Sequence, residues 1–145
     1  MADDSRTFTA EVLTPQGKVF EGEAFQVSAR TMVGEVGIRA RHAPMLARLV
    51  PHELRVFETE ADFGSASGAR RYAAAEGWLE VFANKVTVLV TEAVDPDSLD
   101  TADLKARVED AETRLGEADE DSAAHRTAEQ DKARAEAFLE IASGS

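Results

Sequence analysis

The sequence of 145 residues contains no cysteine, which excludes disulfide bonds, thiolate nucleophiles and zinc sites built from thiolates. Its three histidines, His42, His52 and His125, do not have the spacing of a metal-binding motif. No run of about 18 apolar residues is present, so we expect no membrane-spanning helix. The acidic start, residues 1–6, does not resemble a signal or transit peptide.

Basic side chains are also scarce. Sixteen lysines and arginines stand against 28 aspartates and glutamates, and the net charge of -12 argues against binding to nucleic acid or anionic lipid. The charge is uneven, because residues 99–145 hold six basic and 13 acidic side chains. A chain of this length can form one compact domain with an appendage. We therefore predict two domains, residues 1–96 and residues 97–145.

The first domain has the pattern of antiparallel β-structure. Residues 8–92 show short apolar stretches with period-2 alternation between turn residues. Phe25, Val27 and Ala29, for example, place three apolar groups on one face, as in a strand that covers a core on one side. Many short strands without helices between them predict a β-sandwich or a flattened barrel.

Two hairpins are predicted within this domain. Residues 78–83 and 86–91 flank Asn84 and Lys85, and asparagine tolerates the left-handed backbone of a tight turn. Residues 62–68 are small and flexible, so we expect an exposed and mobile hairpin tip there.

Residues 34–47 interrupt the alternation. Gly34 and Gly37 lie close together, a basic stretch follows, and Pro44 comes after His42, so we expect a surface loop without regular strand pairing. The residues leave two interpretations open. The glycines can serve β-bulges with His42 as a structural loop residue, or the segment can be a functional surface.

After Ser98 the apolar period changes from two to 3.6, which predicts two helices. Asp100 is a suitable N-cap for the first helix, and Gly116 is a suitable end. Residues 117–121 form an acidic linker, after which Asp121 or Ser122 caps a second helix that reaches about residue 142. The first helix has an apolar stripe of Leu104, Val108, Ala111 and Leu115.

The stripe of the second helix consists mostly of alanine and is interrupted by Asp131. Its members are Ala124, Ala128, Ala135, Phe138 and Ala142. Buried alanine methyls contribute about 0.8 kcal/mol each, so a hairpin of these helices is marginal alone. It docks on the sandwich, docks on a partner or switches between states; the alternative is a solvated acidic tail without a role. The predicted fold class is mainly β with α: an N-terminal antiparallel β-sandwich followed by a C-terminal antiparallel helical hairpin.

No motif for catalysis is present. Residues 64–68 resemble a nucleophile elbow only superficially, because the central position is Ala66, and no glycine-rich phosphate loop follows a strand. Two alternatives to a non-catalytic protein or subunit remain open. One is a carbohydrate- or ligand-binding sandwich with an acidic tail, and the other is a cupin-like enzyme with His42 and His52 on a metal.

Four segments resemble the epsilon subunit of bacterial F-type ATP synthases. They are the Thr-Pro-x-Gly-x-Val-Phe-x-Gly-Glu-Ala phrase at 14–24, Gly-Glu-x-Gly-Ile at 34–38, the segment at 42–56 that begins His-Ala-Pro, and the hairpin at 76–89. The resemblance covers nearly the whole chain, and the combination of the second and third segments at this spacing is specific.

This resemblance implies a non-catalytic central-stalk subunit that binds the gamma subunit and the c-ring and couples proton flow to ATP synthesis. It implies a peripheral position at the cytoplasmic face of the bacterial membrane, and no cofactor or metal. In the family, the segment matching residues 35–44 lies at the polar loops of the c-ring. The residues expected to make that contact are Glu35, Gly37, Ile38, Arg39, His42 and Pro44.

The family's helical hairpin can also extend along gamma into the alpha/beta head and block ATP hydrolysis. Some relatives bind ATP there through Ile-Asp-x-x-Arg-Ala. This chain has Leu99 and Asp100 but places Asp103 where the arginine would stand. Since a carboxylate repels phosphate, we predict weak or no ATP binding.

Overall fold

The computed structural model describes residues 6–144. Packing divides the chain between Val94 and Asp95 into two compact units, and the predicted domain boundary lies two residues further along. We describe the units separately as the sandwich and the helical hairpin.

The sandwich consists of ten strands, one short helix and the turns between them. The strands are β1 (Phe8–Thr14), β2 (Gly17–Ala24), β3 (Gln26–Thr31), β4 (Gly34–Ile38), β5 (Met45–Leu49), β6 (His52–Phe57), β7 (Arg70–Ala74), β8 (Gly77–Phe82), β9 (Lys85–Val90) and β10 (Ala93–Val94). Helix α1 (Glu60–Phe63) lies between β6 and β7.

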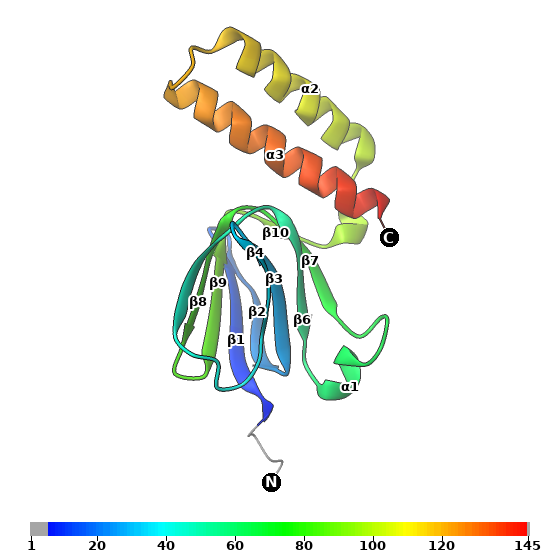
Figure 1. Cartoon of the computed structure of the whole chain (residues 1–145). Helices are drawn as coiled ribbons and strands as arrows, with labels where there is room; N and C mark the ends of the chain where they lie inside the picture. The colour runs from blue at the N-terminus through cyan, green and yellow to red at the C-terminus, as the bar shows by residue number, and fades with distance from the viewer. Residues whose placement is uncertain (1–5, 145) are drawn as a thin grey trace. The chain divides into compact units, whose positions relative to one another are not determined.

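The strands follow the order β10-β7-β6-β3-β5-β8-β9-β1-β2, with β4 paired to β3 beside this path. All neighbours are antiparallel except β1 and β9, which are parallel. The single residue pair Thr31–Leu49 joins β3 to β5. The strands form two layers (Figure 1). The predicted sandwich is confirmed.

The core lies between these layers. In β1, β3 and β9 every second side chain is buried or nearly so, as the alternation in the sequence predicted. The cluster includes Val12, Val27, Leu54, Leu79 and Val88. The opposite faces of the same strands carry most of their polar and charged residues, with Leu13 and Leu89 as apolar exceptions.

The prediction that strand pairing cannot run through residues 34–47 is wrong. β4 pairs with β3 over its whole length, from Gly34 opposite Thr31 to Ile38 opposite Val27, and only residues 39–44 form a loop. Gly34 adopts a φ of 134° at the turn, which glycine tolerates. Gly37 leaves room for a neighbour, because a Cβ there would lie 2.9 Å from Gln26 Nε2.

The expected hairpin tip at residues 62–68 does not begin as a turn, because residues 62 and 63 belong to helix α1. Thr59 and Asp62 cap this helix reciprocally. The Phe63 ring packs 5.1 Å from the ring of Phe57 and 5.8 Å from that of Phe25. This aromatic contact ties the segment to the sandwich.

The hairpin of β8 and β9 is confirmed, with its turn one residue earlier than expected. Ala83 and Asn84 have φ values of 52° and 60°, which is the left-handed geometry of a two-residue hairpin turn. The Asn84 side chain accepts a hydrogen bond from the Arg41 backbone N–H at 2.8 Å and donates one to the Thr7 carbonyl at 3.0 Å. It thereby holds the loop 39–44 and the start of β1 against this turn.

The helical hairpin begins with the short 3-10 helix η2 (Pro96–Ser98) and contains α2 (Thr101–Glu117) and α3 (Ala123–Ser143). Asp100 and Ser122 are the N-caps, as predicted. Gly116 does not end α2, which continues to Glu117.

The packing between α2 and α3 is sparse. The buried residues are Leu104, Ala111, Ala128, Ala135 and Phe138, whereas Ala124, predicted to lie on the stripe, is exposed. Asp131 is tolerated near the interface because Arg114 pairs with it at 3.0 Å and with Asp110 at 2.9 Å. Two ion pairs, Arg114 with Asp131 and Lys132 with Glu112, connect α2 and α3. They supplement an interface whose small alanine side chains bury little apolar surface.

Deletion of residues 99–145 should leave the sandwich folded, because its core cluster consists only of residues from the first unit. The single tryptophan, Trp78, lies in β8, so its fluorescence reports on the sandwich alone. We expect one cooperative urea transition for both the truncated and the full chain, with similar midpoints. Loss of the cooperative transition after truncation would contradict this prediction.

Candidate functional site

The six residues predicted to contact a partner lie on β4 and on the loop 39–44. Glu35 stands at the start of β4, beside the turn from β3, while His42 and Pro44 follow the far end of the strand. Since a strand rises about 3.3 Å per residue, Glu35 and Arg39 are roughly 13 Å apart. The structure therefore spreads these residues along β4.

β4 pairs only with β3 among the strands in residues 6–144, so its other side is an open sheet edge. We call β4 and the loop 39–44 the β4 edge. Ile38 is 1% exposed, so its side chain belongs to the core and is not available for contact. Gly37 and Glu35 are exposed, which leaves backbone and carboxylate groups accessible.

The carboxylate of Glu35 pairs with Arg30 of β3 at 3.0 Å, and its side chain is 76% exposed. The turn beside it is rigid, because the Thr31 hydroxyl accepts from the Val33 N–H and donates to the Gly34 carbonyl. The tip of this turn exposes Met32 and Val33. Met32 and Val33 were not identified from the sequence as exposed residues. The only sequence signal for their exposure is their position in the turn between two strands.

Arg39 is held in place by aromatic side chains. Its guanidinium lies 4.7 Å from the ring centre of Phe25 and 4.8 Å from that of Phe63, and Nε donates to Gln26 Oε1 at 2.8 Å. Cation–π contacts on two rings restrict the side chain. The guanidinium is thus presented at the β4 edge in a fixed orientation.

His42 is exposed on a loop with fixed geometry. Its N–H donates to the Arg39 carbonyl at 3.2 Å, and its Nδ1 donates to the Ala43 carbonyl at 2.7 Å. The preceding residue, Arg41, has a φ of 63°, an uncommon conformation for a residue with a side chain. Asn84 binds the backbone of Arg41, which stabilises this conformation.

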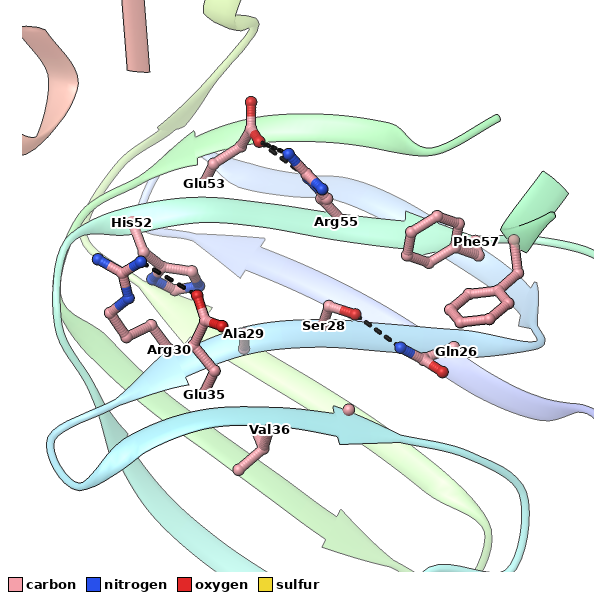
Figure 2. Close-up of a pocket in the computed structure, with 12 residues that line it drawn as sticks. Gln26, Ser28, Ala29, Arg30, Glu35, Val36, His52, Glu53, Arg55 and Phe57 are labelled. Carbon is pink, nitrogen blue, oxygen red and sulfur yellow. Dashed lines mark hydrogen bonds and ion pairs between the residues drawn. The ribbon is translucent and has the colours of Figure 1, made fainter. Parts of the chain in front are cut away.

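A groove with mostly polar lining is formed by residues of β3, β4, β6 and α1 (Figure 2). In its wall Gln26 donates to the Ser28 hydroxyl at 2.8 Å. The Glu53 carboxylate accepts from Arg55 and from Arg71, each at 2.8 Å. The charged residues and the histidine that line the groove are Arg30, Glu35, His52, Glu53 and Arg55.

His52 is the unusual member of this groove. It is 4% exposed, its Nδ1 donates to the Val50 carbonyl at 2.6 Å, and its Nε2 is buried without a hydrogen-bond partner. Burial lowers the pKa of His52, an effect that Arg30 adds to, while the Val50 carbonyl and the Glu35 carboxylate oppose it. The ring is therefore neutral at pH 7, with its proton on Nδ1.

The hypothesis of a metal held by His42 and His52 is wrong. β6 is antiparallel to β3, so His52 begins its strand near the turn between β3 and β4, whereas His42 follows the opposite end of β4. Within residues 6–144 no group of three or more potential metal ligands is present.

Exposed apolar side chains gather on the outer face of the other layer. Trp78 of β8 stands opposite Leu89 of β9, and Leu46 of β5 stands opposite Glu80, the next outward residue of β8. Phe82 extends the set along β8. We call Leu46, Trp78, Phe82 and Leu89 the apolar face; each is between 47% and 68% exposed.

The comparisons with known proteins agree with the motifs. The family model "ATP synthase, Delta/Epsilon chain, beta-sandwich domain" matches residues 7–96. The ATP synthase epsilon chain of Halalkalibacterium halodurans is 34% identical over 137 residues, which are 94% of this chain and 97% of the relative. The chain belongs to the ATP synthase epsilon chain family.

Other relatives give the same result. The epsilon chain of Persephonella marina is 35% identical over 93% of this chain and 96% of its own. The mitochondrial ATP synthase of Euglena gracilis, in a structure with OSCP, F1 and c-ring, contains a chain similar in fold, with a TM-score of 0.74 and 21% identity. That match covers 94% of this chain and 82% of the other.

As an epsilon-family member the chain is a stalk subunit of an ATP synthase, and a carbohydrate-binding module is not favoured. No helix in residues 6–144 is long and apolar enough to cross a membrane. The family's Gly-Glu-x-Gly-Ile motif forms β4, and its His-Ala-Pro motif lies in the loop that follows.

The lowered pKa of His52 predicts a pH dependence of stability. Because the unfolded chain binds this proton more readily, the free energy of unfolding should fall as pH drops below about 6.5, by about 1.4 kcal/mol per unit of pKa difference, and level off below the folded pKa. Urea unfolding at pH 7.5 and 5.5 should show this loss in the wild type. His52→Gln should reduce it, whereas His42→Gln, at an exposed site, should retain it; equal slopes in all three would contradict the assignment.

Proposed function

We propose that this chain is the non-catalytic central-stalk subunit of a bacterial F-type ATP synthase, held between gamma and the c-ring at the cytoplasmic face of the membrane. Its role is to help transmit rotation between proton flow and ATP synthesis. The observation that carries the proposal is the near full-length match to ATP synthase epsilon chains.

The c-ring contact runs along the β4 edge. Glu35 and His42 lie near opposite ends of β4, so a surface that includes both must follow the strand lengthwise. This edge offers the Glu35 carboxylate, the oriented Arg39 guanidinium and the unpaired backbone groups of an open strand. Charged and backbone groups of this kind bind polar loops through charge-assisted hydrogen bonds, without a pocket.

The gamma contact lies on the apolar face. Several large exposed apolar side chains on one face of a sheet are a common mark of a protein interface, and aromatic residues are enriched at such interfaces. Trp78 lies across from Leu89 on the neighbouring strand, and together they form its centre. The two proposed contacts therefore use different layers of the sandwich.

The helical hairpin has the sparse core expected of an element with two arrangements of similar energy, which supports inhibition of ATP hydrolysis by its extension into the alpha/beta head. Asp103 pairs with Arg107 of the same helix at 3.0 Å, so the start of α2 holds a carboxylate where an arginine would attract phosphate. We keep the prediction of weak or no ATP binding.

The first functional prediction concerns the β4 edge. Glu35→Lys combined with His42→Ala should reduce proton-coupled ATP synthesis in membrane vesicles severalfold, because it removes a charge-assisted bond and a ring from the contact. The sandwich should remain folded, since an exposed ion pair such as Arg30–Glu35 contributes at most about 1 kcal/mol. Glu23→Lys makes the same charge change on the exposed side of β2 and should leave coupling intact. Unchanged coupling in the double variant would contradict the contact.

The second concerns the apolar face. Trp78→Ser should weaken co-purification with gamma by tenfold or more, because a central aromatic residue of an interface contributes about 2 kcal/mol or more. Val33→Ser, which replaces an exposed apolar residue at the tip between β3 and β4, is the matched control and should retain gamma. If both variants bind gamma as the wild type does, the apolar face is not the gamma contact.

A further inference from the structure

The Nε2 atom of His52 is the one buried side-chain nitrogen or oxygen in residues 6–144 without a hydrogen-bond partner. Such an atom costs about 1–3 kcal/mol unless something compensates it, and an unpaired polar group in a folded protein calls for an explanation. The proposed stalk function makes no use of this atom.

The surroundings of His52 limit what can pair with Nε2. The Val50 carbonyl occupies Nδ1, and on β7 the residue opposite His52 is Ala74. The charged groups that act on the ring are Arg30 of β3 and Glu35 of β4, and Figure 2 shows this pair beside the ring at one end of the groove.

The other acceptors of the groove are already engaged. The Glu53 carboxylate accepts from Arg55 and Arg71, and the Ser28 hydroxyl accepts from Gln26. The Glu35 carboxylate is different, because it pairs with Arg30, a half-exposed arginine on the same hairpin. Glu35 is thus the acceptor most easily released toward His52.

We propose that His52 is a proton-binding site that controls the orientation of Glu35, so that protonation draws the Glu35 carboxylate away from Arg30 and inward to Nε2. In the neutral state Nδ1–H binds the Val50 carbonyl, Nε2 is unpaired and Glu35 stays on Arg30. A proton taken from solvent makes Nε2 a donor. The imidazolium then attracts Glu35 and repels Arg30, and both effects favour the inward position.

The consequence for the complex rests on the proposed function. Glu35 turned toward His52 no longer presents its carboxylate at the β4 edge, so acid should weaken the c-ring contact. The β4 edge would then respond to the proton concentration on its own side of the membrane, through a side chain that does not touch the partner.

The proton site is tested by histidine NMR on the full chain alone. The signals of His42, His52 and His125 are followed from pH 4.5 to 8, with His52→Gln identifying the buried ring. We expect Glu35→Gln to shift the His52 midpoint downward and Arg30→Gln to shift it upward, while His42 and His125 stay unchanged as internal controls. A His52 signal that does not titrate overturns the proposal. A His52 midpoint that is the same in the wild type, Glu35→Gln and Arg30→Gln overturns it as well.

The effect on Glu35 is tested by binding of the full chain to a purified gamma–c-ring rotor, one pH unit above and one below the measured midpoint. The wild type should bind about tenfold more weakly below it, as expected for loss of one charge-assisted hydrogen bond, and His52→Gln should not show this difference. An equal difference in both proteins, or none in the wild type, overturns the switch. If Glu35→Lys binds as the wild type does at both pH values, the proposed c-ring contact fails, and the NMR result still decides the proton site.

Discussion

The hydrogen-bonded pairing of β4 with β3 on one side only is the constraint on which the proposed c-ring surface depends. It turns two short motifs, which would otherwise be a flexible loop, into a straight edge with Glu35 near one end and His42 beyond the other. It also places Glu35 across from Arg30 and next to the buried ring of His52. An open edge is usually a liability for aggregation, and here two glycines and a glutamate keep it polar and short.

The net charge of this edge is positive, whereas the net charge of the whole chain is negative. The protein has a net charge of -12, yet residues 34–44 contain two arginines and one glutamate, and Arg30 of the neighbouring strand β3 adds a third arginine. Arg39 is stacked on two rings and Arg30 is paired with Glu35, so these cations are ordered. Ordered guanidinium groups favour partners with exposed carbonyl and carboxylate oxygens, while the remaining negative surface disfavours nonspecific contact with acidic polymers.

The sandwich and the hairpin could be predicted because their signals are local: period 2 in one region, period 3.6 in the other, and caps at Asp100 and Ser122. The pairing of β4 could not, since glycines and a proline nearby resemble a loop until the partner strand β3 is known. The helix α1 was missed because its stability comes from Phe63 packing on Phe25 and Phe57, which are far away in sequence. The apolar face was hidden for a related reason, because Trp78 and Leu46 are neighbours only after β5 pairs with β8.

His52 shows why a functional group can be invisible in the sequence and conspicuous in the structure. It shares the inward side of β6 with Leu54 and Val56, both fully buried, and an apolar residue there would avoid the loss of about 1–3 kcal/mol for an unpaired buried atom. A purely structural position would favour such a residue, since proteins are only marginally stable. What the imidazole adds is a nitrogen that can take up a proton beside the Arg30–Glu35 pair, and Glu35 of that pair lies on the β4 edge proposed to contact the c-ring.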